Sequence, residues 1–261
     1  MDQSKTTAYA SVNGLNMYYE IHGSGSLPLV LLHGGGSTIE TTFGNMLPLL
    51  SDYGKLIAVE LQAHGRTSDR DAPESFEQDA DDVAALLQYL KIEKASFLGF
   101  SNGGTTTLQI AIRHPDLVGK IVVVSGAYQR EGFIDGFFEG MKNASIDNMP
   151  EPLKIAYVKV APDKNGLQVM FSKDKERMLT FKDIDENAIK SINVPALFMV
   201  ADQDVITVEH TVKMSDVIPR ARLAILPGIH GSFIGEICTF KKGSKLPELT
   251  AVLIKEFLEE V

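Results

Sequence analysis

Short, uninterrupted apolar runs alternate with amphipathic helical patterns along most of this chain, and this alternation constrains the fold more than any other feature. The runs are residues 28–33, 55–60, 95–100, 120–125, 195–201 and 222–227. A short run that is apolar at nearly every position is typical of a strand covered on both faces, as in a parallel sheet. The sequence therefore predicts an α/β fold with a mostly parallel sheet.

Helical patterns and one hairpin signal account for much of the remaining sequence. Apolar residues recur at helical spacing from Phe76 to Leu90, and Ser75 with Gln78 predicts a capping box at the start of that helix. Further helices are expected over residues 102–113, 205–217 and 247–259. At the front, Asn13-Gly14 between strand-like segments 8–13 and 15–21 is typical of a β-hairpin.

Residues 128–190 interrupt this alternation. They carry many Phe and Met residues among charges and contain no run typical of a buried strand. We expect a helical cap inserted into a core made of residues 1–127 and 191–261, lying over the carboxyl ends of the strands where ligands bind. The alternative is a helical excursion that only packs on the sheet.

Composition excludes several classes of function. The net charge is −9, which disfavours binding to a phosphate backbone, so no nucleic-acid partner is expected. The sequence contains no stretch of about 18 apolar residues, so no membrane span is expected. The polar start lacks the apolar segment of a signal peptide, and Cys238 is the only cysteine, so no intrachain disulfide is possible. We expect a cytoplasmic protein; its oligomeric state is left open.

Gly99-Phe-Ser-Asn-Gly103 matches the pattern G-x-S-x-G, with Ser101 at its centre. The motif follows a predicted strand and opens a predicted helix, which is the setting of a nucleophile elbow. Glycine suits the two flanking positions because a Cβ atom there would clash within so sharp a turn. The alternative is a glycine-rich turn with an incidental serine.

A serine nucleophile needs a base and an orienting carboxylate, which follow it in the order acid, then histidine, in chains with this elbow. His230 lies in a loop just past a predicted strand, whereas His210 lies inside a predicted helix. Asp204 and Asp202 both follow the strand ending at Val200. We favour His230 as the base and Asp204 as the acid, with Asp202 as a brace of the turn.

His33-Gly34-Gly35-Gly36 follows another strand and matches the HGGG type of oxyanion loop. We expect the backbone N–H of Gly35 to be one oxyanion donor, with Gly36 as the next candidate. The backbone N–H of Asn102, at the start of a helix, is the expected second donor. His33 is interpreted as a structural residue whose ring holds this loop.

Two other groups of polar residues have structural interpretations. His64 and Arg66 follow a strand and are expected to buttress the oxyanion loop, although they could instead pair with a substrate carboxylate. Asp79, Asp81 and Asp82 suit the positive end of a helix dipole without a metal. Since no metal or nucleotide motif is present, no cofactor and no metal are expected.

The sequence resembles the α/β-hydrolase superfamily over essentially its whole length, and within it the compact bacterial serine hydrolases with a short helical cap. The resemblance rests on residues 29–34, 64–68, 112–116, 194–198 and 227–230, with the elbow at Ser101 and the acid at Asp204. It implies an eight-stranded, mostly parallel sheet flanked by helices, with a helical cap insertion. It also implies Ser101 as nucleophile, Asp204 as acid and His230 as base.

Several departures narrow this resemblance. Asn102 stands where Met or Gln is commoner, and the chain has no tryptophan, which disfavours a dehalogenase-type halide site. A serine nucleophile disfavours dehalogenases and epoxide hydrolases alike. The HGGG loop lacks the Pro-Gly typical of many C–C hydrolases and proline iminopeptidases.

The sequence therefore predicts a cofactor-free serine hydrolase. The expected substrate is a small or medium ester, lactone or thioester with an apolar acyl part, cleaved through an acyl-enzyme. Two alternatives stay open. One is a lyase or acyltransferase using the same three residues, and the other is a binding protein with very slow turnover.

Overall fold

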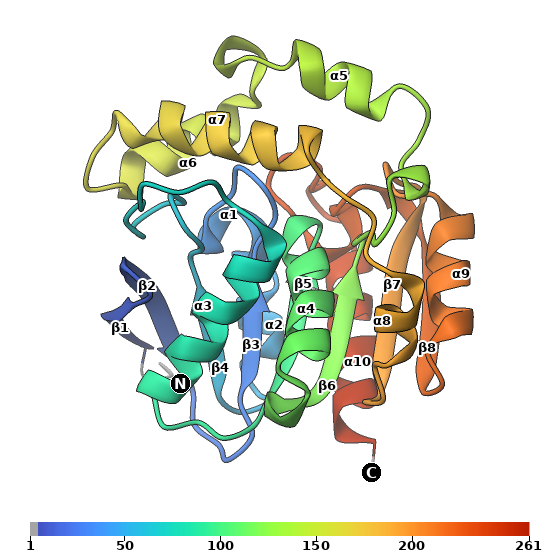
Figure 1. Cartoon of the computed structure of the whole chain (residues 1–261). Helices are drawn as coiled ribbons and strands as arrows, with labels where there is room; N and C mark the ends of the chain where they lie inside the picture. The colour runs from blue at the N-terminus through green and yellow to red at the C-terminus, as the bar shows by residue number, and fades with distance from the viewer. Residues whose placement is uncertain (1–4, 261) are drawn as a thin grey trace.

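The computed structural model describes residues 5–260, which form an eight-stranded sheet covered by helices on both faces (Figure 1). The strands are β1 Lys5–Val12, β2 Leu15–His22, β3 Leu29–Leu32, β4 Leu56–Val59, β5 Ala95–Phe100, β6 Val118–Val124, β7 Ala196–Gln203 and β8 Ala221–Ile229. Their order across the sheet is β1-β2-β4-β3-β5-β6-β7-β8. Only the β1–β2 and β2–β4 pairs are antiparallel. The predicted α/β class, the hairpin at Asn13-Gly14 and the mostly parallel sheet are confirmed.

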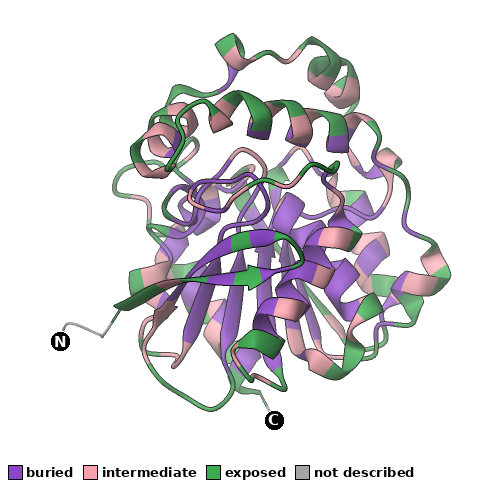
Figure 2. Cartoon of the chain, turned by 60° about the vertical axis from the view of Figure 1, so that its left-hand side comes forward, coloured by how far each residue is buried: buried purple, intermediate pink, exposed green. Residues whose placement is uncertain are grey.

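The central strands are buried on both faces, which explains their continuous apolar sequence (Figure 2). Along β3, Val30 and Leu32 belong to one core cluster, while Leu29 and Leu31 belong to the other. Helices α3 Phe76–Tyr89, α4 Asn102–Arg113 and α9 Val208–Val217 contribute to the first cluster. Helices α1 Ile39–Phe43, α2 Leu47–Leu50 and α10 Leu246–Glu259 contribute to the second. No helix within residues 5–260 is both long and apolar enough to cross a membrane.

The start of α3 differs in one detail from the expected capping box. The Ser75 side chain accepts a hydrogen bond from the backbone N–H of Gln78 at 3.1 Å, as expected. The reciprocal bond is not formed, because the Gln78 side chain donates to Asp82 at 2.9 Å instead.

Segment 128–190 divides into two structurally different parts. Helices α5 Phe137–Asn143, α6 Glu151–Val160 and α7 Gly166–Leu179 lie above the carboxyl ends of the strands, at the top of Figure 1; we call these three helices the cap. Helix α8 Glu186–Lys190 instead lies in the layer of α4 and α9. Ile184 and Ile189 pack into the large core cluster, so the end of the segment belongs with the sheet rather than the cap.

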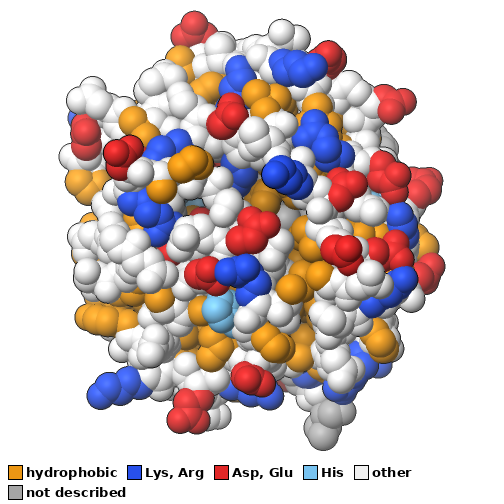
Figure 3. Space-filling model, viewed as in Figure 1, with side chains coloured by type: hydrophobic (Ala, Val, Ile, Leu, Met, Phe, Trp, Pro, Cys, Tyr) orange, Lys and Arg blue, Asp and Glu red, His pale blue; other side chains and the backbone are white. Residues whose placement is uncertain are grey.

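Acidic and basic side chains are interspersed over the face seen in Figure 3, with apolar side chains between them. The expectation that the chain has no nucleic-acid partner stays a prediction.

Candidate active site

Ser101 lies at a sharp turn between β5 and α4, with a backbone φ of +54° that is rare for a non-glycine residue. A Cβ atom on Gly99 would lie 2.0 Å from the carbonyl oxygen of Gly103. One on Gly103 would lie 2.1 Å from the carbonyl oxygen of Leu32. Both contacts are far inside van der Waals distance, so the turn requires glycine at both positions, as the motif predicts.

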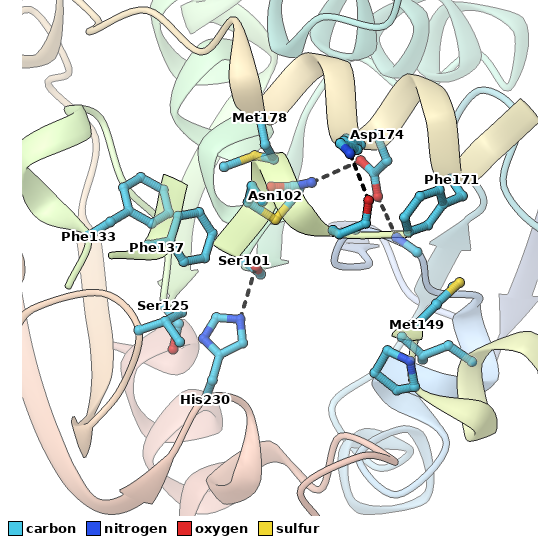
Figure 4. A pocket seen from close by; sticks show the side chains of 18 of the residues that line it. Ser101, Asn102, Ser125, Phe133, Phe137, Met149, Phe171, Asp174, Met178 and His230 are labelled. Atoms are coloured by element: carbon cyan, nitrogen blue, oxygen red, sulfur yellow. Dashed lines mark hydrogen bonds between the residues drawn. The ribbon is translucent and has the colours of Figure 1, made fainter. Parts of the chain in front are cut away.

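The structure brings Ser101, His230 and Asp204 together in one hydrogen-bonded chain. Figure 4 shows the contact between Ser101 and His230. His230 lies directly after β8, and its Nε2 atom is 3.0 Å from the Ser101 Oγ atom. Its Nδ1 atom is 2.6 Å from Oδ1 of Asp204, which directly follows β7. This is the arrangement that a nucleophile, a general base and an orienting carboxylate require.

Asp204 is buried and accepts hydrogen bonds on both carboxylate oxygens. The Ser125 hydroxyl donates to Oδ2 at 2.6 Å, and the backbone N–H of Ile206 donates to Oδ1 at 3.2 Å. Burial acts to raise the pKa of Asp204, but the bonds from His230 and Ser125 hold that pKa below its ordinary value. Asp204 is therefore ionised beside His230 at neutral pH.

Asp202 and His210, the alternative acid and base, do not join this hydrogen-bonded chain. Asp202 accepts a hydrogen bond from the backbone N–H of Gly228 at 2.8 Å and so braces the turn, as expected. His210 is buried against the Tyr128 ring, with the two ring centroids 4.7 Å apart, and burial lowers its pKa to about 4. It does not line the pocket at Ser101.

The loop after β3 comes close to the start of α4. An added Cβ on Gly35 would lie 2.6 Å from Nδ2 of Asn102, so these two residues are in near contact. Neither the Gly35 nor the Asn102 backbone N–H donates a hydrogen bond to any acceptor in residues 5–260. The two residues expected to donate to an oxyanion thus lie close together, and neither backbone N–H is engaged by another acceptor among the described residues.

His33 holds this loop in place, as its interpretation predicts. Its Nδ1 atom is 2.8 Å from the carbonyl oxygen of Gly34, and its Nε2 atom accepts from the backbone N–H of Leu61 at 3.1 Å. Complete burial lowers the pKa of His33 to about 3, so the ring is neutral.

Comparisons with known proteins agree with this fold. The model of the α/β hydrolase fold family matches residues 28–153. Human serine hydrolase BPHL is 33% identical over 162 residues, covering 59% of this chain and 55% of that protein. The dihydrolipoyllysine-residue acetyltransferase component of the acetoin cleaving system of Cupriavidus necator is 29% identical over 152 residues, covering 58% of this chain and 40% of that protein. The matched region thus spans about half the length of these curated relatives.

Among solved structures, CarC, a serine hydrolase involved in carbazole degradation, superposes with a TM-score of 0.79 at 23% identity. The alignment covers 98% of this chain and 99% of that one. The chain belongs to the α/β-hydrolase superfamily. The fold expected from the resemblance is therefore established.

In this α/β-hydrolase the backbone N–H of Gly36, the second candidate oxyanion donor, is already engaged. It donates to Oδ2 of Asp174, on cap helix α7, at 2.5 Å, and it also lies 3.2 Å from Nε2 of His64. The other oxygen of Asp174 accepts from Nδ2 of Asn102 at 3.1 Å. Gly36 is therefore not available to an oxyanion in this structure, while Gly35 is.

His64 and Arg66 lie behind the oxyanion loop and do not line the pocket, in keeping with a buttressing role. Nδ1 of His64 is 2.8 Å from the carbonyl oxygen of Gln62. Nε2 of His64 is 3.5 Å from Asp174 Oδ2. Arg66 pairs with buried Glu60 at 2.7 Å. Burial alone would lower the pKa of His64, but the Asp174 carboxylate raises it to about 9.

The three aspartates at the start of α3 do more than face a helix dipole. Asp79 pairs with Arg177 of the cap at 2.7 Å, Asp81 pairs with Arg113 at 2.6 Å, and Asp82 pairs with Arg70. Among the residues that the structure describes, no group of three or more His, Cys, Asp and Glu side chains is arranged to hold a metal ion.

The pocket in front of Ser101 has a volume of about 340 Å³. Most of its apolar wall comes from segment 128–190, through Phe133, Phe137, Met141, Met149, Leu153, Met170, Phe171 and Met178. Phe133 and Phe137 lie to one side of Ser101 in Figure 4, and Met149 and Phe171 lie to the other. The polar residues of the lining are Ser101, Asn102, Thr105, Ser125, Asn148, Asp174, Lys175 and His230.

Sequence reasoning missed Ser125 and Asp174. Ser125 directly follows the last residue of β6, just as Asp204 directly follows β7. Its place at the carboxyl edge of the sheet was the signal that could have identified it. Asp174 and Arg177 are spaced three apart on α7 and face the core rather than solvent. A charged pair in a segment rich in Phe and Met was the available signal.

Proposed function

We propose that this α/β-hydrolase is a serine hydrolase that cleaves a small or medium ester, lactone or thioester through an acyl-enzyme. The observation that carries the proposal is the chain of contacts from Ser101 Oγ to His230 Nε2 at 3.0 Å and from His230 Nδ1 to Asp204 at 2.6 Å. The names of BPHL and CarC, both serine hydrolases, support the same reaction class.

In the proposed mechanism the Ser101 Oγ atom attacks the substrate carbonyl carbon while its proton passes to Nε2 of His230. Asp204 fixes the His230 tautomer and stabilises the imidazolium. The backbone N–H groups of Gly35 and Asn102 bind the oxyanion, and one such donor is typically worth about 3 kcal/mol. Collapse of the intermediate expels the leaving group, which takes the proton from His230. Water then repeats the cycle on the acyl-enzyme.

The apolar lining favours a substrate with an apolar acyl part. Aromatic and Met side chains dominate the wall, and only Asp174, Lys175 and His230 among the lining residues carry ionisable side chains. Burial of acyl carbons against such a wall stabilises the bound substrate by about 0.8 kcal/mol per methylene.

The first prediction tests the nucleophile. Ser101→Ala removes the attacking oxygen, so kcat on any ester that the wild type cleaves should fall by at least about 1,000-fold. Covalent labelling by a fluorophosphonate, read by mass spectrometry, should vanish in the variant. Labelling that persists in Ser101→Ala would show that another residue is the nucleophile.

The second prediction tests the acid and uses its neighbour as a matched control. Asp204→Asn leaves His230 without an ionised partner and favours the wrong tautomer, so kcat should fall by about 10³- to 10⁴-fold. Asp202→Asn alters only a turn contact and should cost less than about tenfold. If the two variants rank in the opposite order, Asp202 is the acid and the proposed mechanism is wrong.

One comparison favours a second candidate, an acyltransferase, because a matched relative is named as an acetyltransferase component. The acyl-enzyme on Ser101 would then pass its acyl group to an alcohol or thiol rather than to water. Product analysis with a chromogenic acetate ester and added short-chain alcohols or thiols separates the two. Hydrolysis as the main route at millimolar acceptor supports the first proposal, and predominant transfer supports the second. Tight ligand binding with almost no turnover would instead indicate a binding protein.

A further inference from the structure

We infer that Asp174, on cap helix α7, is a positioning residue that holds both sides of the oxyanion hole. This inference rests on the proposed function of the Gly35 and Asn102 backbone N–H groups. Asp174 itself does not touch the reacting atoms in this scheme. It acts through the residues that carry them.

The contacts of Asp174 divide between the two sides of the hole. One carboxylate oxygen accepts from the backbone N–H of Gly36, the residue after Gly35, at 2.5 Å. The other accepts from the side chain of Asn102, whose own backbone N–H is the second donor, at 3.1 Å. The Gly35 backbone lies between them, since an added Cβ there would be 2.6 Å from both Asp174 Oδ2 and Asn102 Nδ2. One carboxylate thus contacts both sides of the hole, and Figure 4 shows its bond to Asn102.

A bare carboxylate at this place would repel a developing oxyanion, so its charge must be balanced. A buried cation, Arg177, and the buried imidazole of His64 face it. Arg177, one turn along α7, donates to Oδ1, and His64 lies 3.5 Å from Oδ2. Burial acts to raise the pKa of Asp174, but Arg177 and His64 hold it well below its ordinary value. Asp174 is therefore ionised, and its charge is neutralised from the side away from the pocket.

The same ion pairs connect the hole to the rest of the molecule. Arg177 also donates to Asp79 of α3 at 2.7 Å. A continuous path therefore runs from α3 through Arg177 and Asp174 to the oxyanion loop. Since the cap carries two of these residues, the seating of the cap on the core and the geometry of the oxyanion hole are coupled.

The neighbouring residue Lys173 supplies a matched control. Its Nζ atom donates to Asp69 at 2.7 Å and to the backbone carbonyls of Arg70 and Ala72 at 2.7 and 2.8 Å. Lys173 therefore also ties α7 to the core, but none of its hydrogen bonds goes to the oxyanion loop. Loss of cap anchoring affects both variants, whereas loss of oxyanion-hole positioning affects only the Asp174 variants.

The experiment compares Asp174→Ala, Asp174→Asn and Lys173→Ala with the wild type in two measurements. Hydrogen exchange of the peptide covering residues 33–37 reads the Gly36 N–H directly and needs no substrate. It should speed up by about tenfold or more in Asp174→Ala and stay near wild type in Lys173→Ala. For the smallest ester, an acetate, kcat should fall about 10- to 100-fold in Asp174→Ala, because a misplacement of about 1 Å costs that much. KM should change little.

The conservative variant, Asp174→Asn, separates positioning of the oxyanion hole from simple anchoring of the cap. Asp174→Asn keeps one carbonyl acceptor for the Gly36 N–H but turns an NH₂ group toward Asn102. Its exchange rate and its kcat should therefore both lie between those of Asp174→Ala and the wild type. Equal effects of Asp174→Ala and Lys173→Ala on exchange would overturn the inference and leave Asp174 as a cap anchor. Absence of fluorophosphonate labelling at Ser101 in the wild type would overturn the proposed function instead, while the exchange data still decide whether Asp174 holds the loop.

Discussion

Ser125 shows how much of the site's chemistry depends on a single side chain outside the Ser101–His230–Asp204 chain. Its hydroxyl donates to the Asp204 oxygen that does not face His230, at 2.6 Å. Its backbone φ of +51° is unusual for a serine and directs the residue into the site. Both carboxylate oxygens of Asp204 are consequently oriented, which leaves Oδ1 aimed at the imidazole.

Removal of this hydroxyl is therefore expected to weaken catalysis without abolishing it. A hydrogen bond to a buried charged group is worth about 1.5–3 kcal/mol, so Ser125→Ala should lower kcat/KM by about 10- to 100-fold. Because the bond from Ser125 helps to hold the pKa of Asp204 down, the acidic limb of the pH–rate profile should also move to higher pH. Ser191→Ala, which removes only a contact to the Ala188 carbonyl on α8, is the control. An unchanged acidic limb in Ser125→Ala would show that Ser125 does not act through Asp204.

At the scale of elements, helices α3 and α7 meet at a buried cluster of charged side chains. Arg177 is surrounded by Asp79, Asp174 and Glu74, and both carboxylate oxygens of Glu74 lack a hydrogen-bond donor among residues 5–260. Burial raises the pKa of Glu74 to about 7 and that of Asp79 to about 6. Both carboxyl groups therefore bind protons more tightly in the folded protein than in the unfolded chain.

The sign of the resulting pH dependence follows from linkage. From the ordinary value of 4.5 up to about 7, the folded state holds a proton on Glu74 that the unfolded state has lost, so stability falls as pH rises through this window. His64 acts in the same direction at higher pH. Its pKa is raised to about 9, so the stability it contributes is complete below about 6.5 and is lost as pH rises through 9.

Glu74→Gln removes the titrating group but keeps its shape. The melting temperature of the wild type should fall between pH 5 and pH 8, and the fall should be smaller in Glu74→Gln, which should be the more stable protein at pH 8. Glu77→Gln, on the exposed side of α3, is the matched control and should keep the wild-type slope. Equal slopes for the two variants would show that Glu74 is ionised in the folded protein at neutral pH.

The elements themselves were predictable because their signals are local. Apolar runs marked all six parallel strands, although β8 lies at the edge of the sheet and is largely exposed rather than covered on both faces. The Asn13-Gly14 turn and the Gly99–Gly103 elbow each need only a few adjacent residues. Contacts between distant segments that no motif marks were not predictable. Arg177 pairs with a residue 98 positions away, and Gly36 with one 138 positions away. Periodicity carries no information on such pairs, which is why Asp174 and the core placement of α8 were missed.

On the scale of the whole molecule, the pocket exists only because the cap closes over the carboxyl ends of the strands. The core supplies Ser101, His230 and the oxyanion loop, while segment 128–190 supplies most of the apolar wall. Under the proposed function, reaction chemistry and acyl selectivity therefore reside in different parts of the chain, and each can be changed separately. Removal of all of 128–190 is not a clean test, because Ile184 and Ile189 belong to the core.

A single residue of the wall gives a cleaner test. Phe137 lines the pocket, whereas its neighbour Phe138 does not and packs on Phe133 and Arg130 instead. In the wild type, each methylene added to a series of esters from acetate to decanoate should raise kcat/KM by up to about fourfold until the pocket is full. Phe137→Ala opens one end, so the preferred acyl chain should become longer while acetate is cleaved at nearly the wild-type rate. Phe138→Ala makes a change of equal size outside the pocket and should keep the wild-type preference. If both variants keep that preference, the acyl group lies on the Met149–Phe171 side of Ser101, and the same series on Phe171→Ala should then show the shift.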